Sequence, residues 1–210
     1  MKEKENQKLI VLNANAKMEI LRSRIQPHFL FNTLNTIYSF TLFDHSKTSG
    51  MLSKLYNILH YMIYDCNTPQ ISFNKEINAL LDYINLERER YGEKLSLHIK
   101  QSGSFQNKKI TPLLLQPFVE NAFKHGASKM IYHPWIDISI SIQDHLLYFT
   151  ISNSISENNS LSDTSGIGLD NIRKRLAILY PDQHVFEINK TEQVYTAKLI
   201  IPLAEDPSST

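Results

Sequence analysis

Apolar residues recur at helical spacing in the first part of the chain. From Lys8 to Phe43 they follow every third or fourth position, which predicts one long amphipathic helix. Pro27 inside this helix removes an amide donor, so a kink is expected near Ser23. Asp44–Gly50 is turn-like, and a second helical pattern runs over residues 51–63. These segments predict an antiparallel helical hairpin, which a second copy could complete as a four-helix bundle.

The pattern changes period after a third helix. Asn67–Gln70 contains a proline and interrupts the chain, and Ser72 or Asn74 could cap a helix from about Lys75 to Tyr91 that ends at Gly92. Alternating apolar and polar residues then predict half-buried strands over 95–99, 136–142, 147–151, 185–189 and 194–200.

Two further helical patterns, Leu113–His125 and Leu169–Tyr180, separate these strands. The predicted fold class is therefore α+β: a helical hairpin forming a dimeric four-helix bundle, followed by an α/β sandwich with helices on one sheet face. The expected domains are residues 1–68 and 69–210.

The segment between Asn153 and Gly166, SISENNSLSDTS, has almost no large apolar residues to bury. It therefore predicts a mobile loop. Its place between a strand and a glycine-flanked helix suggests a lid over a ligand, and a plain surface loop is the alternative.

Composition and charge narrow the classes of function. The formal net charge of +1 gives no field that would attract nucleic acid, so direct binding of nucleic acid is not expected. The single cysteine, Cys66, cannot form an internal disulfide, which fits the reducing cytoplasm. The N-terminus lacks a continuous apolar core, so a membrane is expected only through a sensor segment upstream of this chain.

Three local motifs carry candidate chemistry. In the first, QPHFLFN, His28 is a candidate nucleophile because a neutral imidazole has a lone pair near pH 7. Asn32 lies one helical turn on and could position a water near a phosphorylated His28. The alternative is a tolerated proline kink beside an exposed histidine.

The second motif, LLLQPFVENAFKHG, would place Asn121, Lys124 and His125 on one helix face. An amide oxygen suits Mg²⁺, and the two basic side chains suit triphosphate. An ordinary polar face ended by Gly126 as a helix cap is the alternative.

The third motif, GIGLDNIRKRL, places Gly166 and Gly168 before a helix whose first amides could hold a phosphate. A loop-to-helix junction with Arg173–Arg175 in solvent is the alternative.

Taken together and in this order, the three motifs resemble the LytS-like family of bacterial sensor histidine kinases, whose catalytic domain has the Bergerat ATP-binding fold. The phosphoacceptor box looks like QPHFLFNTLNTI, the N-box like LLLQPFVENAFKHG, and the glycine box like GIGLDNIRKRL followed by LY at Leu179 and Tyr180. The linking stretch LDYINLERERYG is also similar. The resemblance implies autophosphorylation by ATP and transfer to an aspartate of a response regulator, often of the LytTR type.

The resemblance also implies a role for each matching residue. His28 would be the phosphoacceptor and Asn121 the Mg²⁺ ligand, and the set that would contact ATP is Asn121, Lys124, His125, Asn153, Gly166, Gly168 and Leu169. The glycines would hinge the lid. The protein would be the cytoplasmic part of an inner-membrane sensor.

Two positions depart from the family pattern. Asn153 stands where the wider superfamily has an aspartate that recognises adenine, and its neutral carbonyl would accept that hydrogen bond more weakly. Phe29 follows His28 where many histidine kinases have an acid, which leaves Glu120 as a candidate general base. These departures make a pseudokinase scaffold a rival hypothesis. An ATPase that releases phosphate to water is a separate rival, and it would leave the histidine hairpin without a purpose.

Overall fold

The computed structural model describes residues 27–127, 133–155 and 166–205. The chain divides into two compact units, each described here by itself. One contains Met1–Pro69 with Leu81–Arg90, and the other contains Gln70–Leu80 with Tyr91–Thr210. The long helix α4 (Phe73–Tyr91) contributes residues to both. Within the described residues, no helix is long and apolar enough to cross a membrane.

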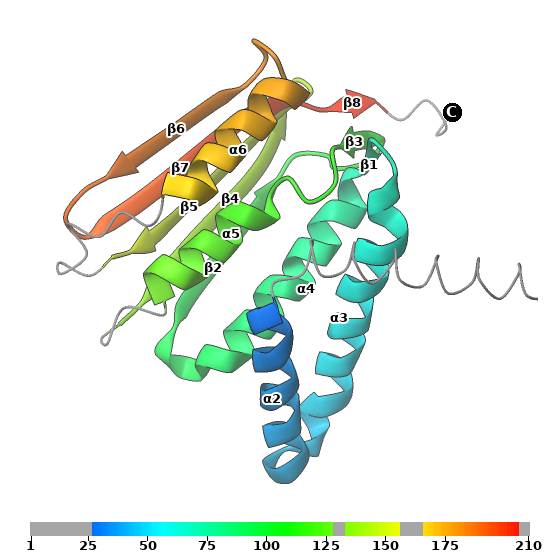
Figure 1. The fold of residues 1–210 in the computed structure, drawn as a ribbon, viewed down its shortest axis with the longest axis vertical. Helices are drawn as coiled ribbons and strands as arrows, with labels where there is room; N and C mark the ends of the chain where they lie inside the picture. Colours follow the sequence, from blue (N-terminus) through cyan, green and yellow to red (C-terminus); the bar gives the residue numbers. More distant parts are fainter. Residues whose placement is uncertain (1–26, 128–132, 156–165, 206–210) are drawn as a thin grey trace, which may run out of the picture. The chain divides into compact units, whose positions relative to one another are not determined.

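The first unit is built on a pair of antiparallel helices, α2 (Pro27–Phe43) and α3 (His45–Tyr64), followed by the short 3-10 helix η1 (Asp65–Asn67) (Figure 1). Phe29 of α2 is buried, with its ring centroid 4.6 Å from that of Tyr83 of α4. The predicted helical hairpin is therefore confirmed. The helix predicted before Pro27 and the kink near Ser23 lie outside the described residues.

The turn predicted over Asp44–Gly50 is wrong, because a single residue joins the two helices. Asp44 caps α3, and its carboxylate accepts a hydrogen bond from the Ser46 backbone N–H at 3.1 Å. Its own N–H donates to the Phe40 carbonyl at 2.8 Å, which closes the end of α2. An aspartate that satisfies the first free amides allows the helix to begin at once, so Gly50 lies inside α3.

The charge on Asp44 is expected to make the first unit's stability depend on pH. The hydrogen bond from the Ser46 side chain lowers the pKa of Asp44 below its ordinary value of 3.8, against a smaller opposing effect of desolvation. A lowered folded-state pKa contributes stability above the unfolded-state value, and this contribution is lost as the pH falls through the folded-state value. Wild type should therefore have a higher urea midpoint than Asp44→Asn at pH 7, and the difference should begin to shrink near pH 3.8 and vanish only below the lower folded-state pKa.

Urea unfolding followed by circular dichroism between pH 7 and pH 3 measures this difference. Glu93→Gln, at an exposed residue in the 3-10 helix η2 (Gly92–Lys94), is the control for the removal of one carboxylate. A difference between wild type and Asp44→Asn that stays constant with pH would contradict the assignment.

The second unit is built on a five-stranded sheet whose strands are ordered β2-β4-β5-β7-β6. Strands β2 and β4 pair in parallel and the other neighbours are antiparallel. The bounds are Ser96–Ser102 for β2, Trp135–Gln143 for β4, Leu146–Ser154 for β5, Val185–Lys190 for β6 and Val194–Pro202 for β7. All five predicted strands are present. Successive side chains of a strand point to opposite faces of the sheet, so alternating apolar and polar residues indicate a strand with one buried face.

Three helical segments lie against one face of this sheet, which gives the predicted α/β sandwich (Figure 1). They are α5 (Gln116–Ala122), the π-helix η3 (Phe123–Ala127) and α6 (Gly166–Leu179). Phe118 of α5 packs edge-on against Phe149 of β5, with ring centroids 5.6 Å apart. The predicted α+β class is therefore confirmed, although the loop predicted between Asn153 and Gly166 falls largely on residues 156–165, outside the described residues.

Several boundaries differ from the sequence prediction. Helix α4 begins at Phe73 instead of Lys75, and it ends as predicted before Gly92, whose φ of 59° favours glycine. A small sheet of β1 (Ile71–Ser72), β3 (Lys108–Ile110) and β8 (Ala204–Glu205) was not predicted. Strands of two or three residues are too short to show a period.

Candidate functional site

The candidate phosphoacceptor His28 lies in the first turn of α2 with its side chain exposed. Its neighbour Phe29 is buried against Tyr83, and successive helix residues are about 100° apart, so the burial of Phe29 turns His28 toward solvent. Asn32 lies one turn on, and its Nδ2 is 3.1 Å from Nδ1 and 3.2 Å from Nε2 of His28. The predicted placement of the two side chains on one face is therefore present.

This contact limits what the imidazole can do. A neutral imidazole has one nitrogen with a free lone pair, and only that nitrogen can accept the Asn32 N–H. The amide can therefore hold the ring orientation in α2, in addition to the predicted role of placing a water. Exposure and a restrained ring suit a nucleophile that must meet a second group in solution.

In the second unit, the N-box spans a change of helix type. Asn121 lies at the end of α5, whereas Lys124 and His125 lie in the π-helix η3. The predicted α-helix over Leu113–His125 is therefore not one regular α-helix, because a π-helix widens the turn after Ala122. Asn121 and His125 are half-buried and Lys124 is exposed.

The end of the N-box meets Asn153, which the sequence placed 27 residues further on. Asn153 on β5 is only 1% exposed, and its Nδ2 donates to the Ser154 carbonyl at 2.9 Å. A Cβ atom added to Gly126 would lie 2.6 Å from that Nδ2. Gly126 is therefore needed for close packing and not as a left-handed helix cap, since positive φ among the described glycines occurs at Gly92 and Gly103.

The glycine box begins its helix earlier than predicted. Helix α6 starts at Gly166 and not at Leu169, so both glycines lie in its first turn and Leu169 follows half-buried. The first turn of a helix leaves backbone N–H groups without helical partners, and these are the donors that a phosphate needs.

The candidate base Glu120 is half-buried on α5 and accepts a hydrogen bond from Gln116 Nε2 at 2.8 Å. It belongs to the second unit, whereas His28 belongs to the first.

Sequence reasoning missed two charged side chains that hold the start of the N-box. Glu76 of α4 is buried, and its carboxylate accepts hydrogen bonds from the backbone N–H groups of Leu113, Leu114 and Leu115 at 2.9, 3.1 and 3.4 Å. Arg175 of α6 donates to the carbonyls of Leu113 and Pro112, both at 2.6 Å.

Glu76 had a signal that could have revealed it, because it lies among the apolar positions Phe73, Ile77 and Leu80 of α4. An acid on an apolar stripe is costly unless it has buried partners. Arg175 carried no such signal, and the alternative in which all of Arg173–Arg175 lies in solvent does not hold at this residue.

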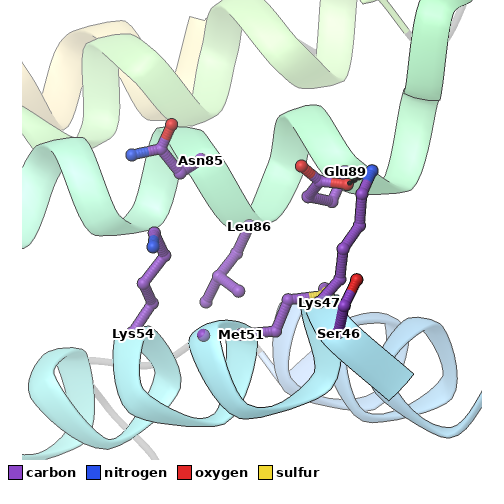
Figure 2. Close-up of a pocket in the computed structure, with 8 residues that line it drawn as sticks. Ser46, Lys47, Met51, Lys54, Asn85, Leu86 and Glu89 are labelled. Carbon is purple, nitrogen blue, oxygen red and sulfur yellow. Dashed lines mark hydrogen bonds and ion pairs between the residues drawn. The ribbon is translucent and has the colours of Figure 1, made fainter. Parts of the chain in front are cut away.

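A separate pocket lies within the first unit, between α3 and α4 (Figure 2). Lys47 of α3 and Glu89 of α4 face each other across it in an ion pair of 3.1 Å. Its lining residues are Ser46, Lys47, Gly50, Met51, Lys54, Asn85, Leu86 and Glu89. None of the predicted site residues lines this pocket.

The described residues of the second unit do not fit a metal ion held by protein ligands alone. They fit a metal ion that also binds the phosphate oxygens of a nucleotide. Among the described residues, no group of three or more His, Cys, Asp or Glu side chains could hold a metal ion. Asn121 offers one amide oxygen, and Mg²⁺ commonly takes few protein ligands and completes its shell with water and phosphate oxygens.

Known sequences that are similar to this chain include sensor proteins and histidine kinases. Residues 16–95 match the family described as histidine kinase. The sensor protein LytS of Staphylococcus epidermidis is 26% identical over 205 residues, which cover 90% of this chain and 34% of that protein. The sensor protein kinase HptS of Staphylococcus aureus is 26% identical over 184 residues, which cover 81% of this chain and 35% of that protein. This chain therefore spans about a third of the length of these relatives.

Solved structures share the fold. The histidine kinase domain of a blue-light activated histidine kinase from Erythrobacter litoralis aligns with a TM-score of 0.50 over 94% of this chain and 98% of that chain, at 12% identity. A bacterial phosphotransferase aligns with a TM-score of 0.50 over 89% of this chain and 96% of that chain, at 10% identity. The family match over residues 16–95 and the relatives that align along most of the chain make it similar in sequence to sensor histidine kinases such as LytS, and the solved structures share its fold.

Proposed function

We propose that this chain uses ATP to phosphorylate His28 and then passes the phosphoryl group to an aspartate of a response regulator. The observation that carries the proposal is the exposed His28 imidazole, held by Asn32, within the region that matches histidine kinases. The relatives are named as sensor proteins and a sensor kinase, which supports a two-component system.

The second unit would hold the nucleotide. Asn121 would ligate Mg²⁺, while Lys124 and His125 would contact phosphate oxygens through charge-assisted hydrogen bonds. Gly166, Gly168 and Leu169 would offer backbone N–H groups at the start of α6. The Mg²⁺ ion would neutralise charge that develops on the phosphates.

Asn153 would face the adenine. It is buried next to Gly126, which ends the N-box. Its Oδ1 can accept the adenine amino N–H, although a neutral acceptor contributes less than a carboxylate.

The phosphoryl transfer itself needs little covalent help from the protein. An imidazole nitrogen of His28 would attack the γ-phosphorus, so that an N–P bond forms while the bond to the β,γ-bridging oxygen breaks and ADP leaves. The ring proton would pass to a base, and Glu120 is the candidate. Positioning and charge neutralisation would supply most of the acceleration.

The first unit would supply the dimer. Large apolar side chains of α2 and α3 remain exposed within this chain: Phe31, Leu34, Tyr38, Leu42, Phe43, Leu52, Tyr56 and Tyr64. An exposed apolar surface of this size favours a partner, and a second copy would complete a four-helix bundle. We place the dimerisation and phosphoacceptor domain at residues 1–68 and the ATP-binding domain at 69–210.

The surroundings of the protein follow from the same proposal. The chain would act in the cytoplasm, joined to an inner membrane only through a sensor segment of a longer protein. Its response regulator would be of the LytTR type, and the chain itself would not bind nucleic acid.

Incubation with γ-labelled ATP and Mg²⁺ tests the proposed function. A phosphohistidine is labile in acid and stable in alkali, so the label on the chain should show that pair of properties. A folded chain that binds ATP and has the mass of a dimer by light scattering, but takes up no label, would favour the pseudokinase scaffold. Steady release of labelled phosphate without a labelled chain would favour the ATPase.

A further inference from the structure

The segment Thr111–Leu115 joins β3 to the N-box helix, and its central residue Leu113 has a left-handed backbone with φ of 55°. A leucine gains nothing from this conformation, so contacts with other elements must maintain it. The segment sets where α5 begins and therefore where Asn121 lies.

Leu113 is held from two sides. Its N–H donates to Glu76 Oε2 at 2.9 Å, and its carbonyl accepts from Arg175 Nη1 at 2.6 Å. The other guanidinium nitrogen, Nη2, donates to the carbonyl of Pro112 at 2.6 Å. The planar guanidinium therefore bridges two successive carbonyls, which a lysine ammonium reproduces poorly because it is a point charge.

Glu76 does more than hold Leu113. Its carboxylate also accepts from the N–H groups of Leu114 and Leu115, directly before the first residue of α5. A negative charge at this end of a helix is favourable, and Glu76 is buried, so these bonds are little weakened by water. The start of α5 is thus fixed by a side chain from α4.

Arg175 connects the same point to the glycine box. It lies on α6, the helix whose first turn contains Gly166 and Gly168. The buried Tyr180, which follows the glycine box, also contacts this segment, since its hydroxyl lies 3.4 Å from Thr111 Oγ1. The later part of the glycine box therefore contacts the segment that leads into the N-box.

We propose that Glu76 and Arg175 are positioning residues that hold Leu113, so that Asn121 and the first turn of α6 keep one fixed separation when Mg·ATP binds. This proposal rests on the nucleotide-binding function proposed above. We call the hydrogen bonds from Glu76 and Arg175 to the segment around Leu113 the clamp. If these bonds are removed, the position of Asn121 relative to the phosphates should change while the rest of the sandwich still folds.

The test compares Arg175→Gln, Arg175→Lys and Glu76→Gln with wild type in the full chain. Lys174→Gln, at the exposed neighbour of Arg175, is the matched control for loss of one positive charge. ATP binding is measured by calorimetry, and the Mg²⁺ concentration for half-maximal labelling is measured at saturating ATP. Thermal unfolding without ligand is recorded for every variant.

Arg175→Gln and Glu76→Gln should raise the half-maximal Mg²⁺ concentration by about 10-fold, the lower end of the effect of losing a direct partner of a metal ligand, because they act on Asn121 only through Leu113 and the start of α5. Arg175→Lys should give a smaller shift, and Lys174→Gln none. A melting temperature that falls while the Mg²⁺ and ATP dependences stay unchanged would reduce the pair to a purely structural role and overturn the proposal.

ATP binding by wild type distinguishes a failure of this proposal from a failure of the proposed nucleotide-binding function. If wild type binds no ATP, the proposed function fails, whereas normal wild-type binding with unchanged variants rejects the clamp alone. If Arg175→Gln does not fold, Arg175→Lys decides the matter by the same criterion, because it keeps the charge and removes the two-carbonyl bridge.

Discussion

His28→Gln is expected to take up no acid-labile label from γ-labelled ATP, while it binds Mg·ATP as tightly as wild type. Glutamine lacks a nucleophilic nitrogen, so no N–P bond can form at this residue. His28 lies in the first unit and is exposed, so the substitution should leave the nucleotide residues of the second unit untouched. Labelling and calorimetry on the same preparation measure both effects.

The matched control is His45→Gln, which replaces another exposed histidine of the first unit. It should label at the wild-type rate. Acid-labile label that persists in His28→Gln would show that another histidine accepts the phosphoryl group, and would contradict the assignment of His28.

Gly126→Val is expected to lose ATP binding and to destabilise the second unit. A Cβ atom at Gly126 would lie 2.6 Å from Nδ2 and 2.9 Å from both Cβ and Cγ of Asn153. Asn153 is 1% exposed and donates to the Ser154 carbonyl, so it has little room to move. Overpacking of this kind costs about 1–3 kcal/mol. It would also displace the residue proposed to face the adenine.

Urea unfolding and ATP titration measure the two parts of this prediction. Gly126→Ala should show smaller losses of both kinds. Adding Asn153→Gly to Gly126→Ala removes all three clashing atoms, so the double variant should regain part of the stability, but not the adenine contact. An unchanged urea midpoint for Gly126→Val would contradict the close packing.

Gly50→Ala is the matched control for a glycine substitution. Gly50 lies inside α3 and has nothing within 4 Å of an added Cβ atom. An alanine in a helix interior is more favourable than glycine by about 0.5–1 kcal/mol. This variant should therefore raise the urea midpoint slightly and leave ATP binding unchanged, which separates steric conflict from a general cost of losing a glycine.

The parts of the fold that follow a period were predictable. The strands of the main sheet and helices α3, α4 and α6 stand close to where alternation or helical spacing put them. Boundaries were harder to predict. Asp44 starts a helix where the turn-like run up to Gly50 suggested a loop, because one capping contact decides that point. The π-helix η3 was invisible for a similar reason, since widening a turn by one residue leaves no pattern.

The candidate site was predictable only as separate motifs. His28 and Asn32 share a helix, so their contact follows from spacing of four residues. Gly126 and Asn153 lie on different elements, and their contact depends on how η3 packs against β5. No pattern in the sequence reports such a distance.

The order of the elements, the strand positions and the motifs that resemble the LytS-like kinases could be predicted from the amino-acid sequence, because they depend on neighbouring residues and on which faces are apolar. The meeting of Glu76 and Arg175 at Leu113, across separations of 37 and 62 residues, became visible only in the folded chain. Local periodicity reports burial, whereas contacts of this kind depend on the path of the whole chain. A charged residue therefore looks the same in sequence whether it lies in solvent, like Lys174, or holds a strained backbone, like Arg175.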